Sequence, residues 1–214
     1  SLPREWNIVG GELYQKPYEG LQGMRTGENY SLSNKTINGS EAIGSVKGRA
    51  VEVEAEFTVG SSEFGLTFLD NARLSYNPAN GTLKLDLTAL PRIQNDEHSF
   101  NGIYQSVLPV APKAGETLKM QVFLDHSILD IFVGDRYAAS VRLFPTDAAA
   151  DGLTVFSNGE TTVKSLNAWT LDPSLRTAIH SISATAPSNG HTYDLLGRKT
   201  IPSRGLYIRD GKKV

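Results

Sequence analysis

The sequence predicts an all-β protein with antiparallel strands, and two segments carry that prediction. In residues 118–144, apolar and polar side chains alternate through three short runs, which Asp125-His126-Ser127 and Gly134-Asp135-Arg136 separate. Residues 50–59 alternate in the same way. Because the loops within 118–144 are too short for a crossover, the three runs are predicted to form an antiparallel meander.

Length and composition set the outer limits of the prediction. A chain of 214 residues allows one large all-β domain with a small appendage. A net charge of −2 without a basic stripe argues against nucleic acid as a partner. The chain has no cysteine, and no apolar run is long enough to span a membrane. We expect no signal peptide in this stretch, and we expect the first residues to come from the middle of a larger protein.

The elements before residue 60 follow from local pattern. Residues 33–49 are rich in Asn, Ser and Gly, so we expect a loop with one short strand. Residues 50–59 are predicted to be a half-buried strand with its apolar side chains turned to the core. Glu52, Glu54 and Glu56 share the opposite face, which we expect to be solvated.

The later elements are read in the same way. Short strands are predicted around residues 64–68, 74–76 and 83–87, and the last strands at 152–156 and 161–171. Residues 88–106 are expected to be irregular, and His98 among them to be a solvated loop residue, since a metal site needs three or four ligands. Trp169 is expected in the core.

The meander also carries a family resemblance. The sequence FLDHSILDIFVGDR, followed by SVRLFP, resembles the hallmark of the C-terminal β-sandwich of glycoside hydrolase family 32, the invertases, levanases and inulinases. The matching positions are Asp125, Ser127, Ile128, Ile131, Phe132 and Val133. Asp130 stands where the family usually has glutamate, which keeps the charge on a shorter side chain. Residues 1–25 and 75–90 resemble the family's linker, first strands and a later hairpin.

The resemblance implies a fold and a domain organisation. It implies a two-sheet antiparallel β-sandwich of the jelly-roll, concanavalin-like type over residues 1–172, followed by a linker at 173–190. Residues 191–214 resemble a small C-terminal β-element related to the type IX sorting segments of secreted Bacteroidetes proteins. In the family the first segment leaves the catalytic propeller and packs along the domain seam. The implied domain-interface residues are therefore Pro3, Arg4, Glu5 and Trp6.

Catalytic machinery is not evident in the sequence. Asp125, His126 and Ser127 are consecutive, so in an extended chain they cannot converge as a relay. A retaining glycosidase needs two carboxylates about 5 Å apart, and the family's catalytic segments belong to the propeller. We therefore expect no catalytic residue, no metal and no cofactor in this chain.

The implied function is that of a non-catalytic C-terminal module in a secreted fructan-hydrolysing enzyme that acts on levan, inulin or sucrose. Its expected partner is the N-terminal propeller of the same polypeptide, with a fructan as a second candidate. The expected location is extracellular, on the cell surface or periplasmic. An apolar patch is expected on the side that holds Pro3 to Trp6.

Two other functions stay open at this point. A carbohydrate-binding, lectin-like module would stack sugars on exposed aromatic side chains gathered on one concave face. The candidates for stacking are Trp6, Tyr14, Tyr18, Tyr30 and Tyr104. A stand-alone β-sandwich glycanase would need a close pair of carboxylates in a cleft. The only row of regularly spaced carboxylates in the sequence consists of Glu52, Glu54 and Glu56.

Overall fold

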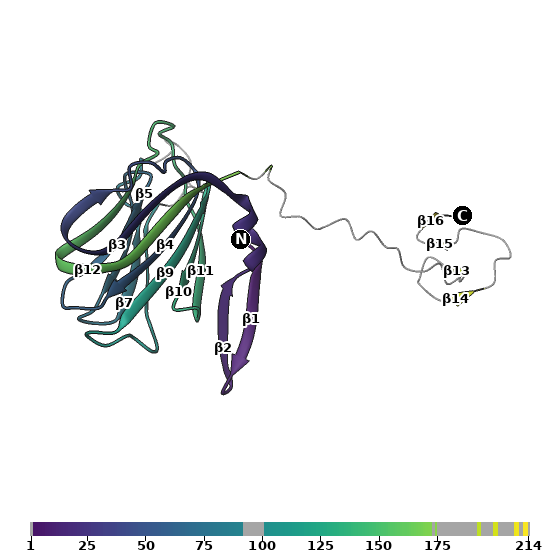
Figure 1. Ribbon diagram of the computed structural model, residues 1–214, viewed down its shortest axis with the longest axis horizontal. Coiled ribbons are helices and arrows are strands. Elements are labelled where there is room, and N and C mark those ends of the chain that lie inside the picture. The colour runs from purple at the N-terminus through teal and green to yellow at the C-terminus, as the bar shows by residue number, and fades with distance from the viewer. Residues whose placement is uncertain are drawn as a thin grey trace. The chain divides into compact units, whose positions relative to one another are not determined.

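The computed structural model of the protein describes residues 2–91, 101–172 and 174, together with four short strands near the C-terminus. The chain divides into two compact units, Ser1–Thr177 and Ala178–Val214. Figure 1 shows the strands of both units. The predictions for His98 and for most of the linker at 173–190 fall outside the described residues.

The first unit is built almost wholly from antiparallel strands, as predicted. It contains a single 3-10 helix among its described residues, η1 (Glu19–Met24). The strands are β1 (Arg4–Val9), β2 (Glu12–Pro17), β3 (Arg25–Ala42), β4 (Ala50–Thr58), β5 (Phe64–Phe68), β6 (Ala72–Asn77), β7 (Thr82–Asp86), β8 (Ile103–Val107), β9 (Thr117–Asp125), β10 (Ile128–Val133), β11 (Tyr137–Arg142) and β12 (Leu153–Leu171).

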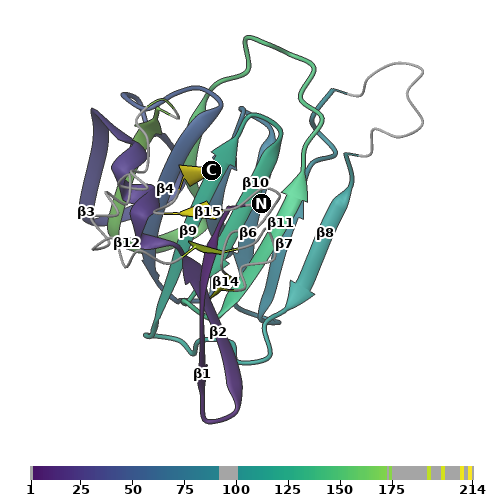
Figure 2. The same ribbon diagram turned by 90° about the vertical axis from the view of Figure 1, so that its right-hand side faces the viewer.

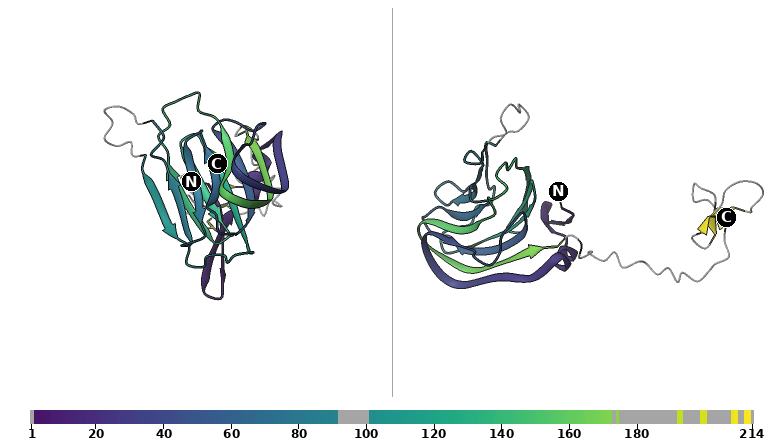
Figure 3. Two further views of the ribbon diagram at one scale, coloured as in Figure 1. Left: turned by 90° about the vertical axis from the view of Figure 1, so that its left-hand side faces the viewer. Right: turned by 90° about the horizontal axis from the view of Figure 1, so that it is seen from above.

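The two layers of the sandwich share one long strand. The hydrogen-bonded order is β11-β10-β9-β4-β12-β5-β6-β7-β8, with β3 paired along β12. Residues 163–170 of β12 pair with β4, and residues 153–157 pair with β5. Figure 2 shows the layers face on, and Figure 3 shows β3 and β12 curving from one layer into the other. The predicted β-sandwich and the meander of β9, β10 and β11 are confirmed.

The inward faces of both layers form one apolar core. Val51, Val53, Ala55 and Phe57 of β4 are buried, as the alternation predicts. The ring of Phe57 stacks on that of Phe64 of β5, with centroids 4.5 Å apart, so the two layers are joined in the core as well as through β12.

Three local expectations are wrong. Most of residues 33–49 belongs to β3, which pairs with β12 at thirteen registered positions from Arg25 to Ala42. Part of the segment expected to be irregular forms the edge strand β8. The last two predicted strands form one strand, β12, with a register shift between Ser157 and Thr161. In each case long-range strand pairing overrides the local turn-forming composition.

The strands β1 and β2 form a separate two-stranded hairpin. Its turn contains Gly10 and Gly11, whose φ values are +60° and +83°. Such tight turns need φ above zero at both central residues, which glycine adopts without steric cost. The hairpin contacts the sandwich through the N–H of Gln15, which donates to the carbonyl of Asp135 at 3.0 Å.

The second unit contains a small antiparallel sheet. Its strands are β13 (Thr192–Tyr193), β14 (Lys199–Thr200), β15 (Ile208–Arg209) and β16 (Lys212–Lys213), in the order β14-β13-β15-β16. Among the residues that the structure describes, no helix is long and apolar enough to cross a membrane.

Candidate functional site

The outer face of the layer β4-β9-β10-β11 carries two rows of side chains that the strand register places side by side. One row runs from Glu52 through Phe123 and Asp130 to Ser140. The next row runs from Glu54 through Gln121 and Phe132 to Ala138. The N-terminal residues and η1 cover part of this face, because Leu2, Leu21 and Met24 belong to one apolar cluster with Phe123 and Phe132.

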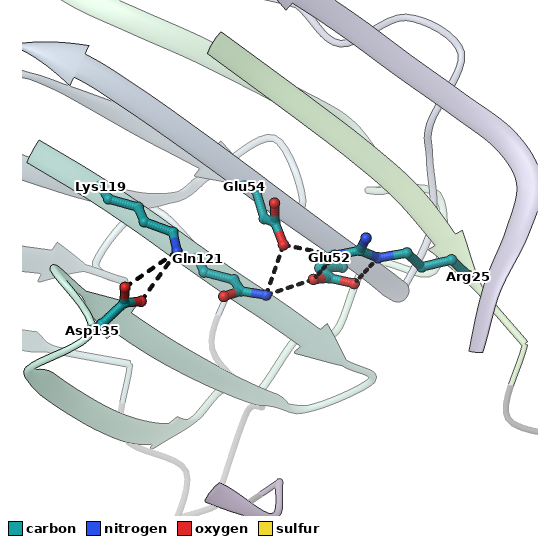
Figure 4. Close-up of polar contacts among 6 residues, drawn as sticks. All are labelled: Arg25, Glu52, Glu54, Lys119, Gln121 and Asp135. Carbon is teal, nitrogen blue, oxygen red and sulfur yellow. Dashed lines mark hydrogen bonds and ion pairs between the residues drawn. The ribbon is translucent and has the colours of Figure 1, made fainter. Parts of the chain in front are cut away.

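A charged network occupies the β4 side of this face. Arg25 donates from Nε and Nη2 to the two oxygens of Glu52 at 2.8 and 2.7 Å, and from Nη2 to Glu54 at 2.7 Å. Gln121 donates from Nε2 to Glu52 at 2.7 Å and to Glu54 at 3.0 Å. Figure 4 shows these contacts and the neighbouring pair of Lys119 and Asp135, whose Nζ and Oδ1 lie 3.1 Å apart.

The expectation of a solvated outer face is therefore wrong for Glu52, whose side chain is 0% exposed. A carboxylate is buried only when other donors replace water, and here Arg25 and Gln121 do so. Burial opposes the charge of the Arg25 guanidinium, but the hydrogen bonds and charges of both glutamates outweigh it and raise the pKa of Arg25. Arg25, Glu52, Glu54 and Gln121 thus form a partly buried network.

The guanidinium of Arg25 also lies over the indole of Trp169, 3.6 Å from the ring centroid. Trp169 is therefore half-buried on the outer face rather than in the core, which corrects the prediction. The even positions of β12 at this end face inward, so Ala168 takes the core position instead.

Asp130 anchors the N-terminal segment to the sheet. Its carboxylate accepts hydrogen bonds from the N–H of Leu2 at 3.1 Å, from Nη2 of Arg4 at 3.4 Å and from the hydroxyl of Ser140. The side chain is 2% exposed. The guanidinium of Arg4 lies over the ring of Phe132, 5.4 Å from its centroid. Arg4, predicted at a domain interface, thus makes its polar contacts within this domain.

The other motif residues do not join Asp130 in a common site. Asp125 is exposed, and its Oδ1 lies 2.9 Å from Nδ1 of His126. The Ser127 carbonyl accepts the N–H of Leu143 at 2.7 Å, but within the described residues no hydrogen bond joins the Ser127 hydroxyl to His126. Asp125, His126 and Ser127 therefore do not form a relay, as predicted from their spacing.

The hairpin presents apolar side chains to solvent. Trp6 is 73% exposed and Ile8 71%, and the register places both on the same face as Leu13. Leu13 also lines an open, mainly apolar cavity of about 400 Å³, whose other walls include Leu108 and Ile131. The expected apolar surface near Pro3 to Trp6 is present on this hairpin.

Glu5 is the other charged residue predicted at the domain interface. Its polar contacts are with residues of β2 and η1. Its carboxylate accepts the N–H of Glu19 at 3.1 Å and pairs with Nζ of Lys16 at 3.0 Å. The Glu19 N–H, followed by Lys16, lowers the pKa of Glu5. Because the side chain of Lys16 is 52% exposed and that of Glu5 36%, this ion pair is a weak contact.

The candidate sugar-stacking aromatics do not gather on one concave face. Trp6 and Tyr14 border one open cavity of about 470 Å³, but the register places them on opposite faces of the hairpin, and Tyr14 faces Arg136. Tyr18 precedes η1, Tyr30 packs against the main core, and Tyr104 belongs to the edge strand β8. The geometry therefore gives no shared aromatic platform.

The carboxylates of β4 are also poorly arranged for glycoside cleavage. Three of the four oxygens of Glu52 and Glu54 already accept hydrogen bonds from Arg25 or Gln121. A glycosidase instead needs one free nucleophile and one acid on either side of the scissile bond. In the described part of the chain, no three His, Cys, Asp or Glu side chains are placed to hold a metal ion.

Comparisons with known proteins agree with this picture of the fold. Residues 20–170 match the model of the family described as "Glycosyl hydrolases family 32 C terminal". A levanase of Bacillus subtilis is 26% identical over 183 residues, which cover 78% of this chain and 26% of the levanase. An acid beta-fructofuranosidase of Vicia faba is 33% identical over 155 residues, which cover 62% of this chain and 24% of that protein.

Solved structures share the fold at low sequence identity. The exo-inulinase of Aspergillus awamori superposes with a TM-score of 0.67 at 22% identity, over 80% of this chain and 35% of that one. Fructan 1-exohydrolase IIa of Cichorium intybus gives a TM-score of 0.63 at 18% identity, over 80% of this chain and 41% of that one. The chain thus spans only about a quarter of these curated relatives and less than half of these solved structures.

Proposed function

Because the chain belongs to the C-terminal domain family of the family 32 glycosyl hydrolases, we propose that it is the non-catalytic module of a larger fructoside hydrolase. The proposed parent enzyme cleaves fructosyl linkages in levan, inulin or sucrose by a retaining mechanism. Support comes from relatives named levanase and acid beta-fructofuranosidase, and from the likeness to an exo-inulinase structure.

The observation that carries the structural role is the exposed apolar face of the hairpin β1–β2. Trp6, Ile8 and Leu13 lie on one face of the hairpin and are largely exposed, and Leu13 also lines the apolar cavity. Several large apolar side chains exposed on one face favour a protein partner over contact with water. We propose that the catalytic propeller of the same polypeptide covers this face.

The Asp130 anchor supports the same role. It holds Leu2 and Arg4 against the sheet and so orients the hairpin at its base. A hairpin fixed in this way loses little further conformational freedom when a partner docks on it. Arg4 then acts by positioning the hairpin, whereas Trp6 makes the proposed contact.

The proposal extends to the cellular location. We propose that the parent enzyme is extracellular, on the cell surface or periplasmic, because residues 191–214 resemble the sorting segments of secreted Bacteroidetes proteins. Detection of the native protein in culture medium, membrane and cytoplasmic fractions would test this, and a purely cytoplasmic protein would contradict it.

The catalytic part of the proposal is tested by incubating the purified chain with sucrose, levan and inulin. We expect no release of fructose, because Glu52 and Glu54 are held by Arg25 and Gln121. The same assay on the full-length parent enzyme, which includes the proposed propeller, should show release of fructose. Release by this chain alone would contradict the non-catalytic role.

The docking part is tested in that larger enzyme with the double variant Trp6→Ser and Ile8→Ser. Two large side chains would lose their burial, so we expect the assembled enzyme to be destabilised by about 3 kcal/mol. Ile103→Ser in the edge strand, where the side chain is 53% exposed, is the matched control. Thermal inactivation measures both, and equal half-lives for the two variants would argue against docking on the hairpin.

A further inference from the structure

A second cavity, of about 400 Å³, opens between the outer face of β4 and β9 and the segment that joins β2 to η1. Its floor includes Glu54, Gln121 and Lys119, and its other walls include Tyr18 and Glu19. Charged and amide groups dominate this lining, unlike that of the apolar cavity beside the hairpin. The structural network described above does not use all of these groups.

The floor presents hydrogen-bond acceptors in fixed positions. Gln121 is 8% exposed, and its Nε2 is held by Glu52 and Glu54. Its Oε1 accepts no hydrogen bond in the described part of the chain, and Figure 4 shows this oxygen turned away from the two glutamates. Glu54 likewise uses only Oε1 in its contacts and remains 29% exposed. Such preformed acceptors lose little entropy on binding a donor.

A donor and a further acceptor lie at the other end of the floor. Lys119 and Asp135 form an ion pair whose side chains are 35% and 50% exposed. Both line the cavity and can exchange part of their mutual contact for hydroxyl groups of a ligand. The cavity therefore offers acceptors at one end and a donor–acceptor pair at the other.

An aromatic ring borders the same cavity. Tyr18 is 49% exposed, and its ring packs directly on Gly20, where an added Cβ would lie 2.3 Å from the ring. Glycine at this position therefore allows the ring to rest where it does. A half-exposed ring beside fixed acceptors is suited to contact the C–H face of a sugar.

The charges in and below the cavity select the class of ligand. Its lining holds the carboxylates Glu19, Glu52, Glu54 and Asp135 against the two cations Lys16 and Lys119, so the excess of negative charge disfavours an anion such as a phosphate or a uronate. A cation would have to compete with Arg25, which already bonds to both glutamates. A neutral ligand with several hydroxyl groups is not repelled by the carboxylates and does not compete with Arg25. Its hydroxyl groups can donate to the acceptors at one end of the cavity and bond to Lys119 and Asp135 at the other.

We propose that this cavity binds one residue of a neutral, hydroxyl-rich polysaccharide, with Glu54 and Gln121 accepting hydroxyl hydrogen bonds and Tyr18 contacting the ring. The site differs from the aromatic platform predicted from sequence, because Tyr18 alone of those aromatics belongs to it. The proposal rests on the proposed function only for the choice of levan and inulin as probes.

The test is native electrophoresis of the 214-residue chain through gels that contain levan, inulin or dextran, compared with a gel without polysaccharide. We expect retardation in at least one polysaccharide. Glu54→Gln and Tyr18→Ala should each raise the Kd by about tenfold or more. The first substitution turns the free acceptor oxygen of Glu54 into a donor, because Oε1 already accepts from Arg25 and Gln121, and the second removes the ring. Glu56→Gln is the matched control, because it makes the same charge change on the same strand but outside the cavity lining.

Circular dichroism melting shows whether each variant is folded, and if Glu54→Gln is not, Tyr18→Ala and Lys119→Ala decide the outcome. Unchanged mobility of the parent chain in all three polysaccharides would overturn the proposal. Binding that survives in the folded cavity variants would also overturn it. Neither result bears on the proposed function, which is tested by fructose release and by the hairpin variants.

Discussion

Arg25 and Glu52 show how a single pair of residues determines the chemistry of the outer sheet face. Glu52 lies on a strand position that alternation assigns to solvent, yet its side chain is 0% exposed. Removing a carboxylate from water costs several kcal/mol unless charged donors replace the water. Arg25 supplies two such donors, and it comes from β3, 27 residues earlier in the chain.

Replacing Arg25 by Met should destabilise the domain by about 3 kcal/mol or more, because it leaves the Glu52 charge buried without its partner. Lys119→Met breaks the exposed pair with Asp135 and should cost about 0.5 kcal/mol at most. Urea unfolding of both variants measures the difference. Similar losses for the two substitutions would show that the Arg25 network contributes no more than a surface ion pair.

Tyr76 is a second residue whose polar atom has an unusual setting. The side chain is 0% exposed, and its hydroxyl has no hydrogen-bond partner in the part of the chain that is described. Burial raises the pKa of Tyr76 above its ordinary value of 10.0. The folded state therefore favours the neutral phenol, and this contribution to stability is present below about pH 10 and is lost as the pH rises further.

Tyr76→Phe should raise the free energy of unfolding by about 1 kcal/mol at pH 7, because it removes an unsatisfied buried hydroxyl. It should also weaken the fall of stability above about pH 10. Tyr137→Phe is the matched control. The Tyr137 hydroxyl accepts the N–H of Val110 at 2.9 Å, so its loss should lower stability by roughly 0.5–1 kcal/mol. Denaturant unfolding at pH 7 and at alkaline pH would show whether the two changes have opposite signs.

Among the elements, the hairpin β1–β2 depends most on contacts made far along the chain. It pairs only with itself in the sheet pattern, so its orientation comes from side chains and a few backbone contacts. Asp130 provides the most buried of these contacts through Leu2 and Arg4. An isolated two-stranded hairpin is at best marginally stable in water, so the anchor also preserves the hairpin itself.

Asp130→Asn should therefore release the N-terminal segment and lower stability by about 2 kcal/mol, since charge-assisted hydrogen bonds are lost. Amide hydrogen exchange within β1 and β2 should become faster than in the parent chain. Asp125→Asn makes the same change at an exposed motif position and should have no such effect. Unaltered exchange in the Asp130 variant would mean that other contacts hold the hairpin.

The whole sandwich owes its closed shape to β3 and β12. β12 has 19 residues and pairs with both β4 and β5, so each layer continues into the other without a separate connection. β3 follows it over most of its length. The layers are thus joined at one side by continuous strands, while β11 and β8 are the outer strands of the sheet order. The apolar cavity beside the hairpin is lined by residues from both of these outer strands or directly after them, such as Ala138 of β11 and Leu108, which follows β8.

The sequence by itself determined the all-β class and the inward faces of the strands that alternate most regularly. The alternation in β4, β9 and β10 is a local property, and the apolar residues that it assigns to the core there are buried. In β11 the same alternation is less informative, because Tyr137 and Val141 are only partly buried and Ala139 is exposed. The motif around Asp125 and the match over residues 20–170 likewise identify the family from the chain alone. The alternation depends on residues one or two positions apart in the chain, so it can be read directly from the sequence.

Only the tertiary structure decided which outer-face residues are buried and how the two layers are joined. Glu52 is buried by Arg25, and Asp130 by Leu2, which lies 128 residues away in the chain. The Asn- and Ser-rich β3 is a strand because β12 pairs with it. In each case the stabilising contacts come from residues that are distant in the sequence, so the local alternation of side chains cannot predict the burial or the strand.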